Sequence, residues 1–146
     1  LHARMHHQRA AAVRARTGGE CLRQHHAYTD HFLASTIDWL KTREAQWAPA
    51  LVYVSDHGES LGENNLYLHG LPYRFAPDVQ KHVPWISWFS PQFERQSGVS
   101  TACLKAKADE RLSHDDYFHS ALGLLNVQTR VYDPARDIGA SFRKAA

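Results

Sequence analysis

An acidic residue and a histidine stand side by side directly after a short apolar run. Residues 51–54 read Leu-Val-Tyr-Val, and Ser55, Asp56, His57 and Gly58 follow them. A carboxylate oxygen and a neutral imidazole nitrogen are both good ligands for Zn²⁺ or Mn²⁺. Two ligands alone seldom hold a metal, so Asp56 and His57 need partners from elsewhere in the chain.

The loop after this pair supplies the next candidates. Glu59, Glu63 and His69 lie in residues 58–70, a stretch rich in Gly, Asn and Ser. A loop of this composition can fold back and carry His69 over the end of the preceding run. Structural interpretations stay open, because Asp-His-Gly commonly forms a turn or cap, Glu63 alone is typical of a solvated side chain, and His69 of a hydrogen-bonded loop histidine.

The apolar run itself predicts a buried strand over residues 50–54. It is too short for a helix and is rich in β-branched and aromatic residues. Open α/β sheets bind ligands just beyond the carboxyl ends of their strands, which is where Asp56 and His57 fall. Neighbouring side chains point to opposite faces of a strand, but at a strand-to-loop break they can converge, especially if Gly58 takes a positive φ.

A helix is predicted before this strand, over residues 28–41. Its apolar side has the spacing of an amphipathic helix and contains Phe32, Leu33, Ile37 and Leu40. We expect this helix to cover the sheet, with Phe32 and Trp39 used in packing.

Two further elements are predicted from apolar and turn patterns downstream. Residues 83–89 read as a second strand that is apolar on both faces, with Pro84 at its start or on an edge of the sheet. Residues 131–138 are typical of a turn followed by a short strand.

A second helix is predicted from Ser113, as its N-cap, to about Leu125. Two aspartates in its first turn favour this start because they complement the helix dipole. His114 and His119 are five residues apart and do not share a helix face, so we expect structural roles for both rather than a shared metal.

Taken together, these strings resemble the lipid A phosphoethanolamine transferases, including the mobile colistin resistance enzymes. The resemblance rests on Val-Ser-Asp-His-Gly-Glu-Ser-Leu-Gly-Glu-Asn at residues 54–64, Tyr-Leu-His-Gly-Leu-Pro-Tyr at 67–73 and Ala-Pro at 76–77, and it continues through 80–90 and 113–124. It implies an α/β fold, namely part of an alkaline phosphatase or sulfatase-like sandwich of helices on a mixed, mostly parallel sheet. Family members are inner-membrane proteins with a periplasmic catalytic domain.

The resemblance also assigns roles to four residues. It makes Asp56 and His57 two ligands of the catalytic zinc, places Glu59 near the substrate amine, and places His69 near the transferred phosphoethanolamine or a second zinc. In the family, a glutamate and a nucleophilic threonine far upstream complete the zinc site, and no segment here matches them. The site is therefore expected to be incomplete, and this chain alone is expected to lack activity.

The family mechanism has two steps and two lipid partners. The threonine attacks phosphatidylethanolamine and releases diacylglycerol, and the phosphoenzyme then donates its group to a lipid A phosphate. Two other classes stay open: a soluble sulfatase or phosphatase-like metal-dependent hydrolase, and a metal-free non-catalytic module. Asp-His-Gly is common to both enzyme classes, whereas the strings around Glu59 and His69 favour the transferase.

Composition and charge exclude few partners but do argue against nucleic acid. The 146 residues include 17 basic and 15 acidic ones, for a net charge of +2, without a basic stripe interleaved with aromatics. No run approaches the roughly 18 apolar residues of a membrane helix, and residues 1–9 lack the apolar segment of a signal peptide. As written, the chain is expected to stay in the cytoplasm.

Residues 1–26 differ from residues 27–146, which we assign to the C-terminal part of the catalytic domain. One interpretation is a disordered or weakly helical basic tail, and another is a metal-binding tract using His2, His6 and His7. We favour a third, a frameshift, because codons for Gly19 to His26 can be read one base later as Val-Asn-Ala-Tyr-Asp-Asn-Thr, a sequence of the kind that precedes Tyr-Thr-Asp in the family. The two cysteines, Cys21 and Cys103, are expected to be free thiols.

Overall fold

The computed structural model describes residue 20 and residues 24–143, which divide into two compact units. The first unit combines the described residues up to Thr36 with residues 55–85. The second combines residues 37–54 with the described residues from Ile86 onward. The interpretations of residues 1–19 and 21–23, including the histidine tract and Cys21, lie outside the described part of the chain, and the predicted boundary at residue 27 stays a prediction.

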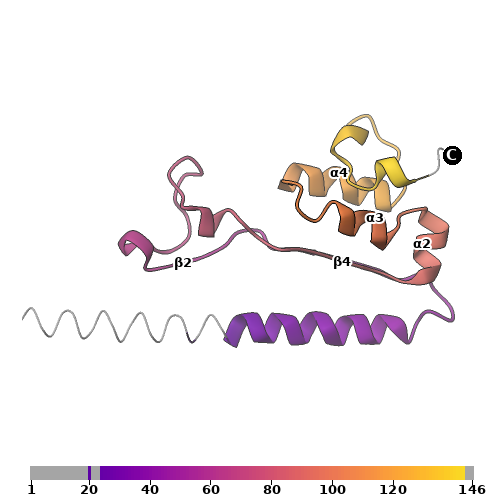
Figure 1. The fold of residues 1–146 in the computed structure, drawn as a ribbon, viewed down its shortest axis with the longest axis horizontal. Coiled ribbons are helices and arrows are strands. Elements are labelled where there is room, and N and C mark those ends of the chain that lie inside the picture. The colour runs from indigo at the N-terminus through magenta and orange to yellow at the C-terminus, as the bar shows by residue number, and fades with distance from the viewer. Residues whose placement is uncertain (1–19, 21–23, 144–146) are drawn as a thin grey trace, which may run out of the picture. The chain divides into compact units, whose positions relative to one another are not determined.

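A helix covers residues 24–41, so the predicted helix is confirmed and begins earlier than expected (Figure 1). Leu33 is buried, and the half-buried positions that accompany it follow the helical repeat: Thr29, Thr36, Ile37 and Leu40. The expectation that Phe32 and Trp39 pack is wrong, since their side chains are 57% and 55% exposed. The reason is the helical repeat, which puts both about 90° around the axis from the centre of the buried stripe.

The first unit contains a short hairpin that matters for the candidate site. Its strands are β2 (Ser60–Leu61) and β3 (Tyr67–Leu68), which pair antiparallel with Ser60 opposite Leu68. The 3-10 turn η1 (Glu63–Asn65) connects them, and a second such turn, η2 (Asp78–Gln80), follows the hairpin. Gly62 has φ 121° at the start of the connection, a conformation that glycine adopts without steric cost.

Two five-residue strands, β1 (Ala50–Val54) and β4 (Trp85–Phe89), form the other sheet. Both strands form where they were predicted, and Pro84 precedes β4 directly. The expectation that residues 50–54 are buried is wrong, because every residue of β1 is half-buried in this two-stranded sheet. The amide of Ser90 donates to the carbonyl of Pro49 at 3.0 Å, which joins the end of β4 to the start of β1 and makes the pair antiparallel. Both described strand pairs thus run antiparallel, so the mostly parallel pairing that the resemblance implied is not found among the described strands.

Two short helices that we did not predict follow β4. They are α2 (Pro91–Ser97) and α3 (Thr101–Ala106). Their signals are present in the sequence, because Ser90 caps α2 with proline next to it, and Gly98 ends α2 in the left-handed region at φ 73°. Cys103 in α3 is half-buried. Because Cys21 lies outside the described residues, the expectation of free thiols stays a prediction.

The last helix, α4 (His114–Leu124), confirms the predicted N-cap. Ser113 and Asp116 form a reciprocal capping box, in which each side chain accepts from the other residue's backbone amide. His119 has the structural role that we expected, since its Nδ1 accepts from the backbone amide of Asp133 at 3.0 Å. The predicted strand within residues 131–138 is wrong: Asp133 instead caps a 3-10 turn, η3 (Pro134–Arg136).

A buried polar network joins the C-terminal turns of the second unit to one another, and the amide of Ile138 donates to the hydroxyl of Ser120 in α4 at 3.1 Å. Figure 1 shows α4 beside η3 and the final turn η4 (Ala140–Phe142), drawn in yellow. The Asp137 carboxylate is fully buried and pairs with Arg143, while Tyr132 donates to it at 2.6 Å and the Gly139 amide at 2.8 Å. Within the described residues, no helix has both the length and the apolar character needed to cross a membrane.

Candidate metal centre

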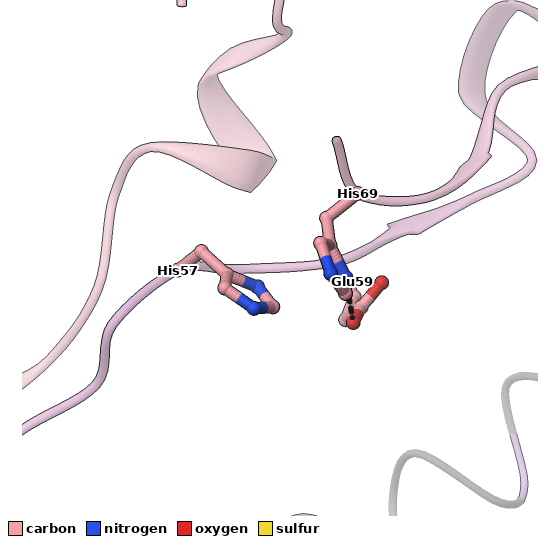
Figure 2. Close-up of side chains that lie close together, drawn as sticks. All are labelled: His57, Glu59 and His69. Carbon is pink, nitrogen blue, oxygen red and sulfur yellow. Dashed lines mark hydrogen bonds and ion pairs between the residues drawn. The ribbon is translucent and has the colours of Figure 1, made fainter. Parts of the chain in front are cut away.

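The first unit brings His57, Glu59 and His69 together. Each offers one ligand atom, and these atoms all lie within 4.8 Å of one another (Figure 2). His57 and Glu59 lie in the segment that leads into β2, and His69 directly follows β3. Because Ser60 pairs with Leu68, the antiparallel register puts Glu59 opposite His69. The prediction that the loop over residues 58–70 folds back is confirmed, since His69 lies beside His57 and Glu59.

Glu59 holds His69 through one carboxylate oxygen and leaves the other unused. Its Oε1 lies 2.7 Å from Nδ1 of His69. Its Oε2 is buried and has no hydrogen-bond partner among the described residues. A buried carboxylate oxygen without a donor is unfavourable unless a cation or donor approaches it, so this atom fits a site that receives a positively charged group.

The Nε2 atom of the His57 imidazole is available to act as a ligand. Its Nδ1 lies 3.1 Å from the carbonyl oxygen of Gly58, which only accepts, so Nδ1 carries the proton and Nε2 is the available ligand atom. The ring lies over that of His69, with 3.7 Å between centroids and 33° between planes.

Asp56 lies beside this group without being one of its three members. Its Oδ1 accepts from the backbone amide of His57 at 3.0 Å, and its Oδ2 lies 3.6 Å from Nε2 of His57. Two ligands of a tetrahedral zinc ion lie about 3.4 Å apart, so the pair has suitable spacing for a common ion. Hydrogen bonds from the backbone amides of His57 and Asp56 hold the pKa of Asp56 below its ordinary value, which keeps the carboxylate charged.

Glu63 stays apart from the cluster. It is exposed, and its carboxylate accepts from the backbone amide of Leu61 at 2.7 Å. Backbone amides in its own turn lower the pKa of Glu63. The interpretation of Glu63 as a solvated side chain therefore agrees with the structure.

Gly58 serves this region through its small size. It is absent from the described residues with positive φ, so the expectation that a left-handed glycine brings Asp56 and His57 together is wrong. A Cβ at this position would collide with the carbonyl oxygen of Val79. Only glycine allows the backbone of the site to approach η2 this closely.

Comparison with known proteins identifies the fold family. The sequence model of the family described as Sulfatase matches residues 19–127, well over half of the chain. The chain belongs to the sulfatase family. This confirms the predicted α/β class and the sulfatase-like fold.

Within that family, the chain is similar to several phosphoethanolamine transferases. It is 47% identical over 112 residues to phosphoethanolamine transferase EptA of Salmonella typhimurium, covering 76% of this chain and 20% of the relative. It is 46% identical over 99 residues to phosphatidylethanolamine transferase Mcr-2 of Escherichia coli, covering 68% and 17%. The chain thus spans about a fifth of the length of the curated relatives that it matches.

A solved structure shares the same architecture. The soluble domain of lipooligosaccharide phosphoethanolamine transferase A from Neisseria meningitidis superposes with a TM-score of 0.75 at 42% identity. The match covers 81% of this chain and 36% of that domain. The described elements therefore correspond to a portion of a larger sulfatase-type domain.

Proposed function

We propose that this chain supplies part of the catalytic domain of a zinc-dependent lipid A phosphoethanolamine transferase. The observation that carries the proposal is the convergence of His57, Glu59 and His69 in a chain whose relatives bear this activity in their names. Two further relatives, 33% identical, are named Kdo(2)-lipid A phosphoethanolamine 7''-transferase. Phosphatidylethanolamine as donor and lipid A as acceptor are the corresponding substrates.

Zinc would be held on the side of the site that Asp56 and His57 form. The free Nε2 of His57 and Oδ2 of Asp56, 3.6 Å apart, are the two atoms with suitable spacing and charge. Bound zinc would stabilise the negative charge that develops on the oxygens of the transferred phosphoryl group. Because these two residues offer only two ligands, a complete site needs ligands from the rest of the domain.

Glu59 and His69 would bind the phosphoethanolamine group itself. The buried Oε2 of Glu59 would accept an N–H of the ethanolammonium, which removes the penalty of its missing partner. His69, held at Nδ1 by Glu59, would lie beside the phosphoryl group. The contact between the two side chains therefore couples recognition of the amine to recognition of the phosphate.

The 146-residue chain by itself would not carry out the transfer. In the enzymes that the sequence resembles, the attacking atom belongs to a threonine in a segment with no match here. A metal held by Asp56 and His57 alone would support weak hydrolysis at most. The chain is also 40% identical to the C-terminal periplasmic domain of phosphoethanolamine transferase EptC from Campylobacter jejuni, with a TM-score of 0.69. By analogy, we propose a periplasmic setting for the complete protein.

Zinc titration of the purified chain by calorimetry tests the proposal. His2, His6 and His7 offer a competing site, so the titration uses a background with these three replaced by alanine. In that background, His57→Ala is expected to weaken zinc binding about 10-fold or more. His82→Ala, which changes an exposed histidine of the same unit outside the group, is the matched control and should leave the affinity unchanged.

The outcomes separate the three function classes. Zinc binding that depends on His57, with no phosphoethanolamine transfer by the chain alone, supports the proposal. Hydrolysis of a simple aryl phosphate or sulfate by the chain would favour the hydrolase class. Absence of zinc binding in the background variant would leave the metal-free module as the better description.

A further inference from the structure

Gln80 is buried at the point where the candidate site and its supporting turn meet. Its side chain is 7% exposed, and it is the only buried residue of η2. The family resemblance includes Gln80 but assigns it no role. Its hydrogen bonds nevertheless reach residues adjacent in sequence to His57, Glu59 and His69.

Three hydrogen bonds connect Gln80 to the site. Its Nε2 donates to the hydroxyl of Ser60 at 2.8 Å and to the carbonyl of Leu68 at 3.1 Å. Its backbone carbonyl accepts from the amide of Gly58 at 3.0 Å. Gly58 separates His57 from Glu59, Ser60 follows Glu59, and Leu68 precedes His69, so every bond ends one residue from a candidate ligand.

These bonds act on a region that has little else to hold it. The β2–β3 hairpin has only two residue pairs, and a two-stranded hairpin of this size is marginally stable in water. Leu68 takes a left-handed φ of 64°, which is strained for a branched side chain and persists only where the surroundings enforce it. The donation from Gln80 to the Leu68 carbonyl supplies such a restraint immediately before His69.

We propose that Gln80 is a positioning residue that sets the separation of His57, Glu59 and His69. It acts through Gly58, Ser60 and Leu68 and touches neither metal nor substrate. A buried amide is well suited to this role because it is uncharged at all pH values and donates two hydrogen bonds at a fixed angle. The expected effect on zinc affinity rests on the function proposed above. The expected effect on the separation of the three side chains does not.

Gln80→Met in the 146-residue chain removes both side-chain donors at nearly constant length. Zinc affinity, measured in the background that lacks His2, His6 and His7, is expected to fall about 10-fold, as for other residues that orient metal ligands. Ser60→Ala removes one of the two acceptors and should give a smaller loss. Ser120→Ala removes a buried hydroxyl that accepts from Ile138 in the second unit, and should lower the melting temperature without changing zinc affinity.

A second readout needs no metal. The rings of His57 and His69 lie close enough for a nuclear Overhauser effect between their protons. This effect should be present in the parent chain and in Ser120→Ala, and lost in Gln80→Met. Loss of the effect without any zinc binding by the parent chain would support positioning and reject the metal role. An undiminished effect and zinc affinity within twofold in Gln80→Met, or in Ser60→Ala if the former does not fold, would overturn the proposal.

Discussion

Glu59 and His69 are ten residues apart in the sequence and meet across the β2–β3 hairpin, with 2.7 Å between Oε1 and Nδ1. The protein's own hairpin sets this contact, so one half of the candidate site is organised by the backbone register. Preorganisation reduces the free energy that binding must spend on ordering side chains. We therefore expect a change at either Glu59 or His69 to affect the position of the other side chain.

Glu59→Gln tests the effect of the negative charge on binding, because it removes the charge and nearly preserves the shape of the side chain. Glu59→Gln keeps an oxygen that can accept from His69 but removes the negative charge that attracts a cation. We expect affinity for phosphoethanolamine to fall about 10-fold in a calorimetric titration, because a charge-assisted hydrogen bond to the amine is lost. Glu63→Gln, four residues away and exposed outside the group, is the matched control. Equal affinities for the two variants would show that the Glu59 charge has no part in binding.

Gly58→Ala should destabilise the first unit and weaken the site. The added Cβ would overlap the carbonyl oxygen of Val79, so the backbone must move away from η2. Gly123→Ala is a control with a similar overlap, against Asp137 and Arg143 in the second unit. Both variants should lower the melting temperature, and only Gly58→Ala should reduce zinc affinity. If Gly123→Ala also reduces zinc affinity, the loss in Gly58→Ala reflects lower stability and not a specific effect on the site.

Ser113→Ala should weaken the start of α4. The hydroxyl accepts from the amide of Asp116 as part of the capping box, and loss of such a cap costs about 1 kcal/mol of unfolding free energy. Urea denaturation would measure the change. Ser113→Thr keeps a hydroxyl and should recover most of the stability, and failure to do so would argue against the cap as the cause.

The second unit should be less stable in acid, because protonation of Glu94 removes a stabilising contribution. Hydrogen bonding to Thr101 at the start of α3, at 2.8 Å from the backbone amide, lowers the pKa of Glu94 in the folded state. The ionised carboxylate therefore stabilises the fold above the unfolded pKa of about 4.3, and this contribution disappears as the pH falls through the lower folded pKa. Because Glu94 is largely solvated, the effect should be below about 1 kcal/mol.

Chemical denaturation at several pH values between neutrality and the acid range would measure this contribution. Glu94→Gln should be less stable than the parent at neutral pH, and the difference should shrink as the pH falls. A constant difference at every pH would show that the charge of Glu94 is not responsible.

Arg143→Met should be the most destabilising of these changes. It leaves the fully buried carboxylate of Asp137 without its cationic partner, and breaking a buried pair in this way costs about 3 kcal/mol or more. The double variant with Asp137→Leu removes both charges and should recover part of the loss in a denaturation experiment. No recovery would indicate that packing by Arg143, rather than charge, dominates.

Local patterns in the sequence predicted the elements whose signals are continuous. The apolar run before Asp56 predicted β1, the run after Pro84 predicted β4, and Ser113 with its following acids predicted α4. The strings around His57 and His69 indicated the family, and both histidines lie in the observed group. These features depend on neighbouring residues, so they can be read along the chain.

Only the tertiary structure decided which residues meet. The pairing of Ser60 with Leu68 brings Glu59 to His69, and the hydrogen bonds of Gln80 link a residue about 20 positions downstream to the same site. The steric role of Gly58 was likewise set by three-dimensional packing. Sequence determined the local conformations and the chemical groups, whereas distances between groups depend on hairpin register and close backbone contacts, which no single segment encodes.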